Sequence, residues 1–202
     1  MSEDLVTIRN KTAVFLIFAA FLSAMMGLVF IDVVWLSDEI HEASLTEIAQ
    51  ELILAVIIFM FIRHARKPVE QRPIRILVAG FFGCMLVREL DFLFDKLGHG
   101  SWFWFALALT IISVVSALRH PRFVVSGLAD FMRHPSWGMM MAGMLTILVF
   151  SRLFGMHELW QHLMPEYYHR TVKNMAEEGS ELLGYTLCLF ATWGYLTTGK
   201  KK

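Results

Sequence analysis

The sequence is poor in cysteine, in proline and in net charge. Its 202 residues include two cysteines and five prolines, and 18 basic residues balance 18 acidic ones. Two isolated cysteines exclude a disulfide-stabilised secreted framework and a CxxC metal site. A chain without a basic excess lacks the clustered positive charge that nucleic-acid binding requires, so we expect no nucleic-acid partner.

Apolar residues, in contrast, are abundant. They make up 56% of the chain, and the mean hydropathy is +0.56, whereas a soluble domain of this size carries more polar surface. The first apolar run, Thr12 to Ile31, contains no charge and is longer than the apolar region of a signal peptide. We therefore expect it to be retained as a helix.

Six segments are long and apolar enough to be membrane-spanning helices, because an α-helix needs about 20 residues to cross a hydrocarbon core of roughly 30 Å. No internal repeat or linker divides the chain. We therefore predict an all-α, polytopic transmembrane bundle in a single integral membrane domain, residues 1–202. The predicted helices cover residues 12–36, 44–63, 75–96, 101–118, 136–152 and 178–197.

The basic residues are unevenly distributed between the predicted loops. Thirteen of the eighteen fall on one side, in the two termini and in the segments that join the second helix to the third and the fourth to the fifth. Basic residues concentrate in cytoplasmic loops. We therefore expect both termini to be cytoplasmic and the chain to lie in a bacterial inner (plasma) membrane, with the lipid bilayer as its surroundings.

Several acidic residues lie inside the predicted helices, toward their outer ends. Helical rise places Glu51 about 10 Å below the outer end of the second helix, and Arg88 and Glu89 at a comparable depth in the third. A charge at the bilayer centre costs about 2.5–3.5 kcal/mol, so these side chains must face protein or water. Arg88 is the one permanent cation predicted at that depth, and we expect it to act as the counter-charge.

An excess of buried carboxylates must take up protons, bind cations or reach water. Carboxylates alone suit Mg²⁺, Ca²⁺ or Mn²⁺, and carboxylates with imidazoles suit Zn²⁺, Mn²⁺ or Fe. We therefore predict a pocket for a divalent metal ion or another cation in the outer leaflet. Its predicted ligands are Glu47, Glu51, Glu89, Asp91, Glu178 and Glu181, and the outer-side histidines that could add ligands are His41, His99, His157 and His162.

Three functions remain open for such a pocket. A metal ion near the membrane surface could activate water against a lipid or another amphiphile, as in a metal-dependent membrane hydrolase. The carboxylates could instead bind and release protons or a cation in a transporter, although the polar groups lie off-centre and no inverted repeat is present. The third function is that of a non-catalytic structural or partner-binding protein stabilised by intramembrane ion pairs.

The combination of acids and histidines at a membrane edge is similar to that in multi-pass hydrolases of the alkaline-ceramidase kind, which would imply zinc. The ordered serine, aspartate and paired-histidine motifs of that family do not map onto this chain. The sequence specifies neither a catalytic residue nor an oligomeric state.

Three further patterns concern helix packing and the long loops. Polar residues recur at spacings of four and three from Asn174 to Tyr195, which predicts a stripe that faces protein. The 153–177 loop is predicted to contain a short interfacial helix, and the 119–135 loop is either a surface helix or a plain connection. Small residues predict close helix approach at Ala20 with Ala24, Gly80 with Gly83, and Gly138 with Gly143.

Overall fold

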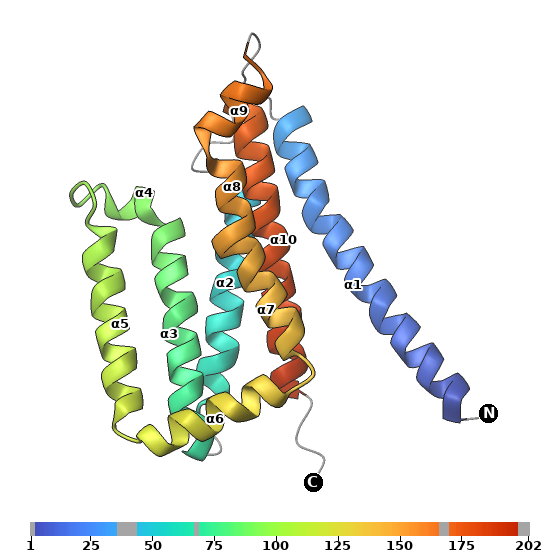
Figure 1. Cartoon of the computed structure of the whole chain (residues 1–202), viewed down its shortest axis with the longest axis vertical. Helices are drawn as coiled ribbons and strands as arrows, with labels where there is room; N and C mark the ends of the chain where they lie inside the picture. Colours follow the sequence, from blue (N-terminus) through green and yellow to red (C-terminus); the bar gives the residue numbers. More distant parts are fainter. Residues whose placement is uncertain (1–2, 36–43, 67–68, 166–169, 198–202) are drawn as a thin grey trace.

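A computed structural model describes residues 3–35, 44–66, 69–165 and 170–197. All regular secondary structure in these ranges is helical, which confirms the predicted class (Figure 1). In chain order the elements are α1 (Glu3–Val34), α2 (Leu45–His64), η1 (Val69–Gln71), α3 (Arg72–Glu89), α4 (Asp91–Phe94), α5 (Trp102–Leu118), α6 (Pro121–Arg133), α7 (Trp137–Leu145), η2 (Thr146–Phe150), α8 (Ser151–Gly155), α9 (His157–Leu163) and α10 (Arg170–Thr197).

The helices differ from the predicted segments mainly at their ends. α1 begins at Glu3 and α10 at Arg170, earlier than the apolar runs that revealed them. The predicted 75–96 helix is divided, because α3 ends at Glu89 and the short helix α4 begins after Leu90. The segment from α7 to α8 is continuous, with a π-helical turn, η2, in its middle. The two long loops contain helices as well, α6 and α9.

Fewer helices than the six predicted are both long and apolar enough to span a membrane. Within the described ranges three qualify, namely α1, α2 and the continuous helix Trp137–Gly155. The pair α5 and α6, which meet at an angle of 102°, would make a fourth if it forms one broken span. The other predicted spans are not long or apolar enough to qualify. α5 alone has 17 residues, and α3 and α10 include charged residues among their apolar ones.

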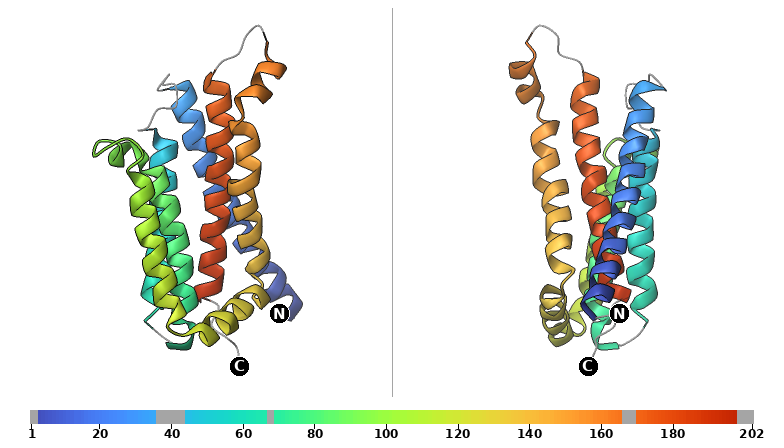
Figure 2. Two further views of the ribbon diagram at one scale, coloured as in Figure 1. Left: turned by 60° about the vertical axis from the view of Figure 1, so that its left-hand side comes forward. Right: turned by 90° about the vertical axis from the view of Figure 1, so that its right-hand side faces the viewer.

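The helices form a bundle in which neighbours in space are not always neighbours in sequence. α5 packs on α3, α3 on α2, α2 on α10, and α10 on α7 and α8 (Figures 1 and 2). α1 lies outermost against α10 and α2, with the Phe18 and Phe190 rings stacked 3.8 Å apart. The start of α1, the end of α10 and α6 lie at one end of the bundle, and α4 and α9 lie at the other (Figure 1).

The core is centred on α2 and α10. Leu54, Ile57 and Phe61 of α2 pack with Leu182 of α10 and Phe82 of α3, and all five are almost fully buried. The polar stripe of α10 is buried in the same interior, at the four positions Glu181, Tyr185, Cys188 and Thr192. The stripe therefore has protein beside it over this length.

Asp32 joins α1 to the start of α2. Its carboxylate is buried and accepts hydrogen bonds from the backbone N–H groups of Leu45 (3.0 Å) and Thr46 (2.8 Å) and from the Thr46 hydroxyl (2.5 Å). A carboxylate at this position satisfies N–H groups that have no partner within the helix and complements the positive end of the helix dipole. Asp32 therefore caps the first turn of α2 together with the N-cap residue Ser44, whose hydroxyl accepts a hydrogen bond from the Glu47 N–H (3.1 Å).

The surroundings of His134, between α6 and α7, indicate that the stability of the folded protein depends on pH. Burial lowers the pKa of His134 below its usual value of 6.5, and its Nδ1 accepts a hydrogen bond from the Ser136 backbone N–H (3.1 Å). Near pH 6.5 the unfolded chain takes up a proton more readily than the folded one, so stability is full above that pH and falls as the pH decreases. We expect the melting temperature to fall more between pH 8 and 5.5 for the wild type than for His134→Asn; equal slopes would contradict this.

Candidate functional site

Charged side chains from separate parts of the chain line one polar pocket of about 210 Å³. α2, α3, α4, α8 and α10 all contribute, near the end of the bundle where α4 lies (Figure 1). Five of the six predicted carboxylates and the predicted counter-charge are among the residues that line it. The lining residues are Glu47, Arg88, Glu89, Asp91, Phe92, Arg152, Glu177, Glu178 and Glu181.

The remaining predicted ligands lie elsewhere. Glu51 is half-buried one helical turn along α2 from Glu47 and does not line the pocket. His99 is fully exposed beside Asp95, and His157 and His162 are exposed on α9. His41 lies outside the described residues. In the part of the chain that the structure describes, no three His, Cys, Asp or Glu side chains are arranged to hold a metal ion.

Glu181 is at the centre of the charged cluster. Its side chain is 2% exposed, and its Oε1 is ion-paired with Arg152 of α8 and lies 3.6 Å from Nη2 of Arg88 of α3. The hydroxyl of Ser151 is 3.2 Å from the same oxygen and within donating distance. This carboxylate therefore joins three helices through two guanidinium groups.

Glu89 is held by a second set of contacts. Its Oε1 lies 2.6 Å from Nη2 of Arg88 and accepts a hydrogen bond of 2.6 Å from the hydroxyl of Tyr185, a fully buried residue of α10. Charge-assisted hydrogen bonds of this kind are stronger than neutral ones. The bond joins α3 directly to α10.

Glu177 and Glu178 have contrasting partners. Glu177 lies between two cations, with Nη1 of Arg152 at 3.3 Å and Nζ of Lys173 at 3.0 Å. Glu178 instead accepts a hydrogen bond of 3.0 Å from the neutral side-chain amide of Gln50, a fully buried residue of α2. The Oε1 of Gln50 is itself buried, and no hydrogen-bond donor for it is found among the described residues.

Arg152 is a residue of the pocket lining that the sequence interpretation did not include. It was assigned to the outer loop, and Arg88 was taken as the one permanent cation at the depth of the acids. That prediction is wrong, since Arg152 lines the same pocket. Even so, six carboxylates line the pocket against two guanidinium groups, with Lys173 as a further cation beside Glu177, so the local charge remains negative when all are ionised.

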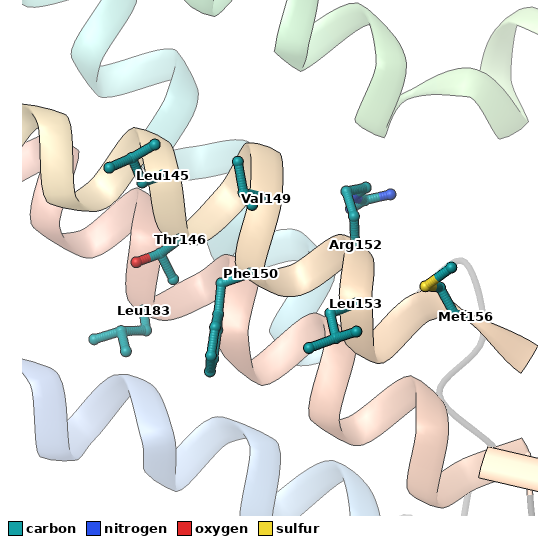
Figure 3. A pocket seen from close by; sticks show the side chains of 8 residues that line it. All are labelled: Leu145, Thr146, Val149, Phe150, Arg152, Leu153, Met156 and Leu183. Atoms are coloured by element: carbon teal, nitrogen blue, oxygen red, sulfur yellow. The ribbon is translucent and has the colours of Figure 1, made fainter. Parts of the chain in front are cut away.

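The π-helical turn η2 directly precedes the two residues that contact Glu181 from this side, Ser151 and Arg152. Such turns are frequent at functional sites, because the extra residue per turn changes the direction of the side chains that follow. Figure 3 shows Arg152 projecting from the helix in a different direction from Phe150, and both residues also line a largely apolar surface pocket on this helix.

No family model matches this chain, and neither a curated protein nor a solved structure matches it significantly. Its function must be inferred from its own residues.

Proposed function

We propose that the polar pocket binds a cation. The observation that carries this proposal is the excess of carboxylates: six acids and two arginines line a space of about 210 Å³. Like charges gathered at a partly buried site are compensated by protons, by a bound cation or by contact with water. The arginine contacts of Glu89, Glu177 and Glu181 compensate part of this charge, and a bound cation would compensate the rest.

The chemistry of the pocket favours a hard cation with oxygen ligands. The negative groups that line it are all carboxylates, which are oxygen donors. Oxygen ligands of this kind suit Mg²⁺, Ca²⁺ and Mn²⁺, so the proposed cofactor is a divalent metal ion. A hydrolase would use the ion to activate water, and a transporter would release it on the other side of the membrane. Both functions begin with the same binding step.

We further propose that the chain crosses a bacterial inner membrane six times with both termini in the cytoplasm, so that the pocket opens in the outer leaflet. In support, the start of α1, the end of α10 and α6 lie together at one end of the bundle (Figure 1), and most basic residues belong to segments at that end. The pocket lies toward the opposite end. α3, α5 and α10 would complete the six spans beside the three apolar ones.

The cation proposal is tested with a pair of glutamate variants. We expect isothermal titration of detergent-purified protein with Mn²⁺ to show binding, with Ca²⁺ and Mg²⁺ as competitors. Glu178→Gln removes a negative charge from the pocket and should weaken the affinity by about tenfold or more, because affinity depends on the number of charged ligands. Glu158→Gln, on the exposed face of α9, should bind as the wild type does. Absence of Mn²⁺ binding, or equal affinities for both variants, would exclude the cation site.

A structural role is the second candidate, and the contacts of Glu181 favour it. One buried carboxylate with two guanidinium groups links α3, α8 and α10. An ion-pair network of this kind would stabilise the bundle without any ligand. Under this alternative neither the wild type nor Glu178→Gln binds Mn²⁺, and variants of the cluster change only the stability of the protein.

A further inference from the structure

An apolar groove of about 280 Å³ adjoins the polar pocket. α3 and α5 form one wall of this groove, and η2 and α8 form the other. Phe81 and Met85 line it from α3, Ala106 from α5, and Ile147 and Leu148 from η2. Groove and pocket adjoin at Arg88 and Arg152, which line both.

The same order of chemistry runs along both walls. On α3 the apolar groove residues Phe81 and Met85 are followed by Arg88 and then by the acidic pocket residues. On the other wall the groove residues Ile147 and Leu148 are followed by Arg152. A ligand lying along the walls would therefore meet an apolar surface, then two guanidinium groups, and then a cluster of carboxylates.

The two arginines remain accessible despite their ion pairs. The side chain of Arg88 is 39% exposed and that of Arg152 is 42% exposed, so each retains N–H donors that can reach a ligand. Guanidinium groups bind phosphate oxygens with geometry that few other side chains match. The boundary between groove and pocket is therefore suited to a phosphate group.

We infer that groove and pocket together bind a phospholipid whose head group carries a primary amine. Its acyl chain would lie in the apolar groove, its phosphate between Arg88 and Arg152, and its ammonium group among the carboxylates. The inference rests on the proposed function, since the ammonium group is then the cation that the pocket takes. Trp102 at the start of α5 lines the groove, and tryptophan at a helix end is typical of the membrane interface, where lipid head groups lie.

Charge complementarity selects this class of lipid over others. An ammonium group presents N–H donors to the carboxylates that line the pocket. A trimethylated choline head cannot donate hydrogen bonds. A glycerol head carries no positive charge, and its phosphate leaves a net negative lipid beside an acidic pocket. The amine-bearing head matches each part of the site.

The test uses the full chain, purified in detergent and stripped of lipid, with short-chain phosphatidylethanolamine, phosphatidylcholine and phosphatidylglycerol as probes. We expect the dissociation constant of phosphatidylethanolamine to be roughly tenfold lower than those of the other two lipids. Phosphatidylethanolamine should also reduce the apparent affinity for Mn²⁺, because both cations occupy the same pocket. Equal affinities for the three lipids, or no competition with Mn²⁺, would overturn the inference.

A groove variant separates this inference from the cation site. Ala106→Trp fills the groove from α5 and should abolish the preference for phosphatidylethanolamine while Mn²⁺ still binds. Ala108→Trp, on the exposed side of the same helix, is the matched control and should leave lipid binding unchanged. Leu148→Trp fills the groove from the opposite wall and gives the same result if Ala106→Trp does not fold. If both groove variants still bind the lipid, the lipid inference is overturned and the proposed cation site is unaffected. If the wild-type protein does not bind Mn²⁺, the proposed function itself is overturned.

Discussion

Glu181→Gln should destabilise the protein more than any other conservative change in the pocket. Its buried carboxylate lies between Arg152 and Arg88, and removing one partner of a buried ion pair costs about 3–5 kcal/mol because the remaining charge is left uncompensated. Both arginines are partly exposed and keep Glu89 or Glu177 as a partner. We therefore expect the lower end of that range, about 3 kcal/mol of unfolding free energy.

For a chain of this length the loss corresponds to a fall in melting temperature of roughly 6–12 °C, measurable by circular dichroism in detergent. Glu158→Gln is the matched control, because it removes the same charge from the exposed face of α9. The double variant Glu181→Leu with Arg152→Leu should recover part of the lost stability, since neither charge is then left alone. A single variant as stable as the wild type would show that the cluster does not stabilise the bundle.

The two proposed roles of the pocket are separable by residue. Glu181 contacts both guanidinium groups, whereas Glu178 is bonded to a neutral amide. If the pocket both stabilises and binds, Glu181→Gln lowers the melting temperature, and Glu178→Gln lowers Mn²⁺ affinity with a smaller effect on stability. If the cluster is structural only, the first effect appears without the second.

The helices and most of the pocket could be predicted from local patterns in the sequence. Apolar runs revealed the helical segments. Counting residues from the basic helix ends placed Glu47 and Glu89 in the outer halves of their helices, and the polar stripe of the last helix included Glu181; all three line one pocket. Glu51 was included in that set because it shares a helix face with Glu47, but it lies one turn farther along α2 and is not among the residues that line the pocket.

The pairing of Arg152 with Glu181 could not be predicted in this way. The two residues belong to different helices, α8 and α10, and whether they meet depends on how those helices pack. Spacing within a single helix contains no information about such a contact. The useful sequence signal was the position of Arg152 at the outer end of an apolar segment, at the depth of the other charges.

Close approach of α7 and α10 is a further feature that the sequence indicated only in part. The pattern of small residues predicted tight packing at Gly138 and Gly143. At Gly143 a Cβ atom would lie 2.7 Å from the backbone oxygen of Gly184 and 2.7 Å from Sγ of Cys188, both on α10. At Gly138 no atom of the described residues lies within 4 Å of a Cβ atom, so this part of the prediction is wrong: Gly138 is outside the contact between α7 and α10.

Gly143→Ala should therefore destabilise the protein by about 2 kcal/mol, because the backbone of α10 cannot rotate away as a flexible side chain would and the two helices must separate. Gly138→Ala is the matched control on the same helix. It meets no neighbour, and alanine is favoured over glycine in a helix by about 0.5–1 kcal/mol, so we expect unchanged or slightly higher stability. Melting temperatures in detergent that fall equally for both variants would contradict the close contact at Gly143, because the glycine-to-alanine change is the same and only its surroundings differ.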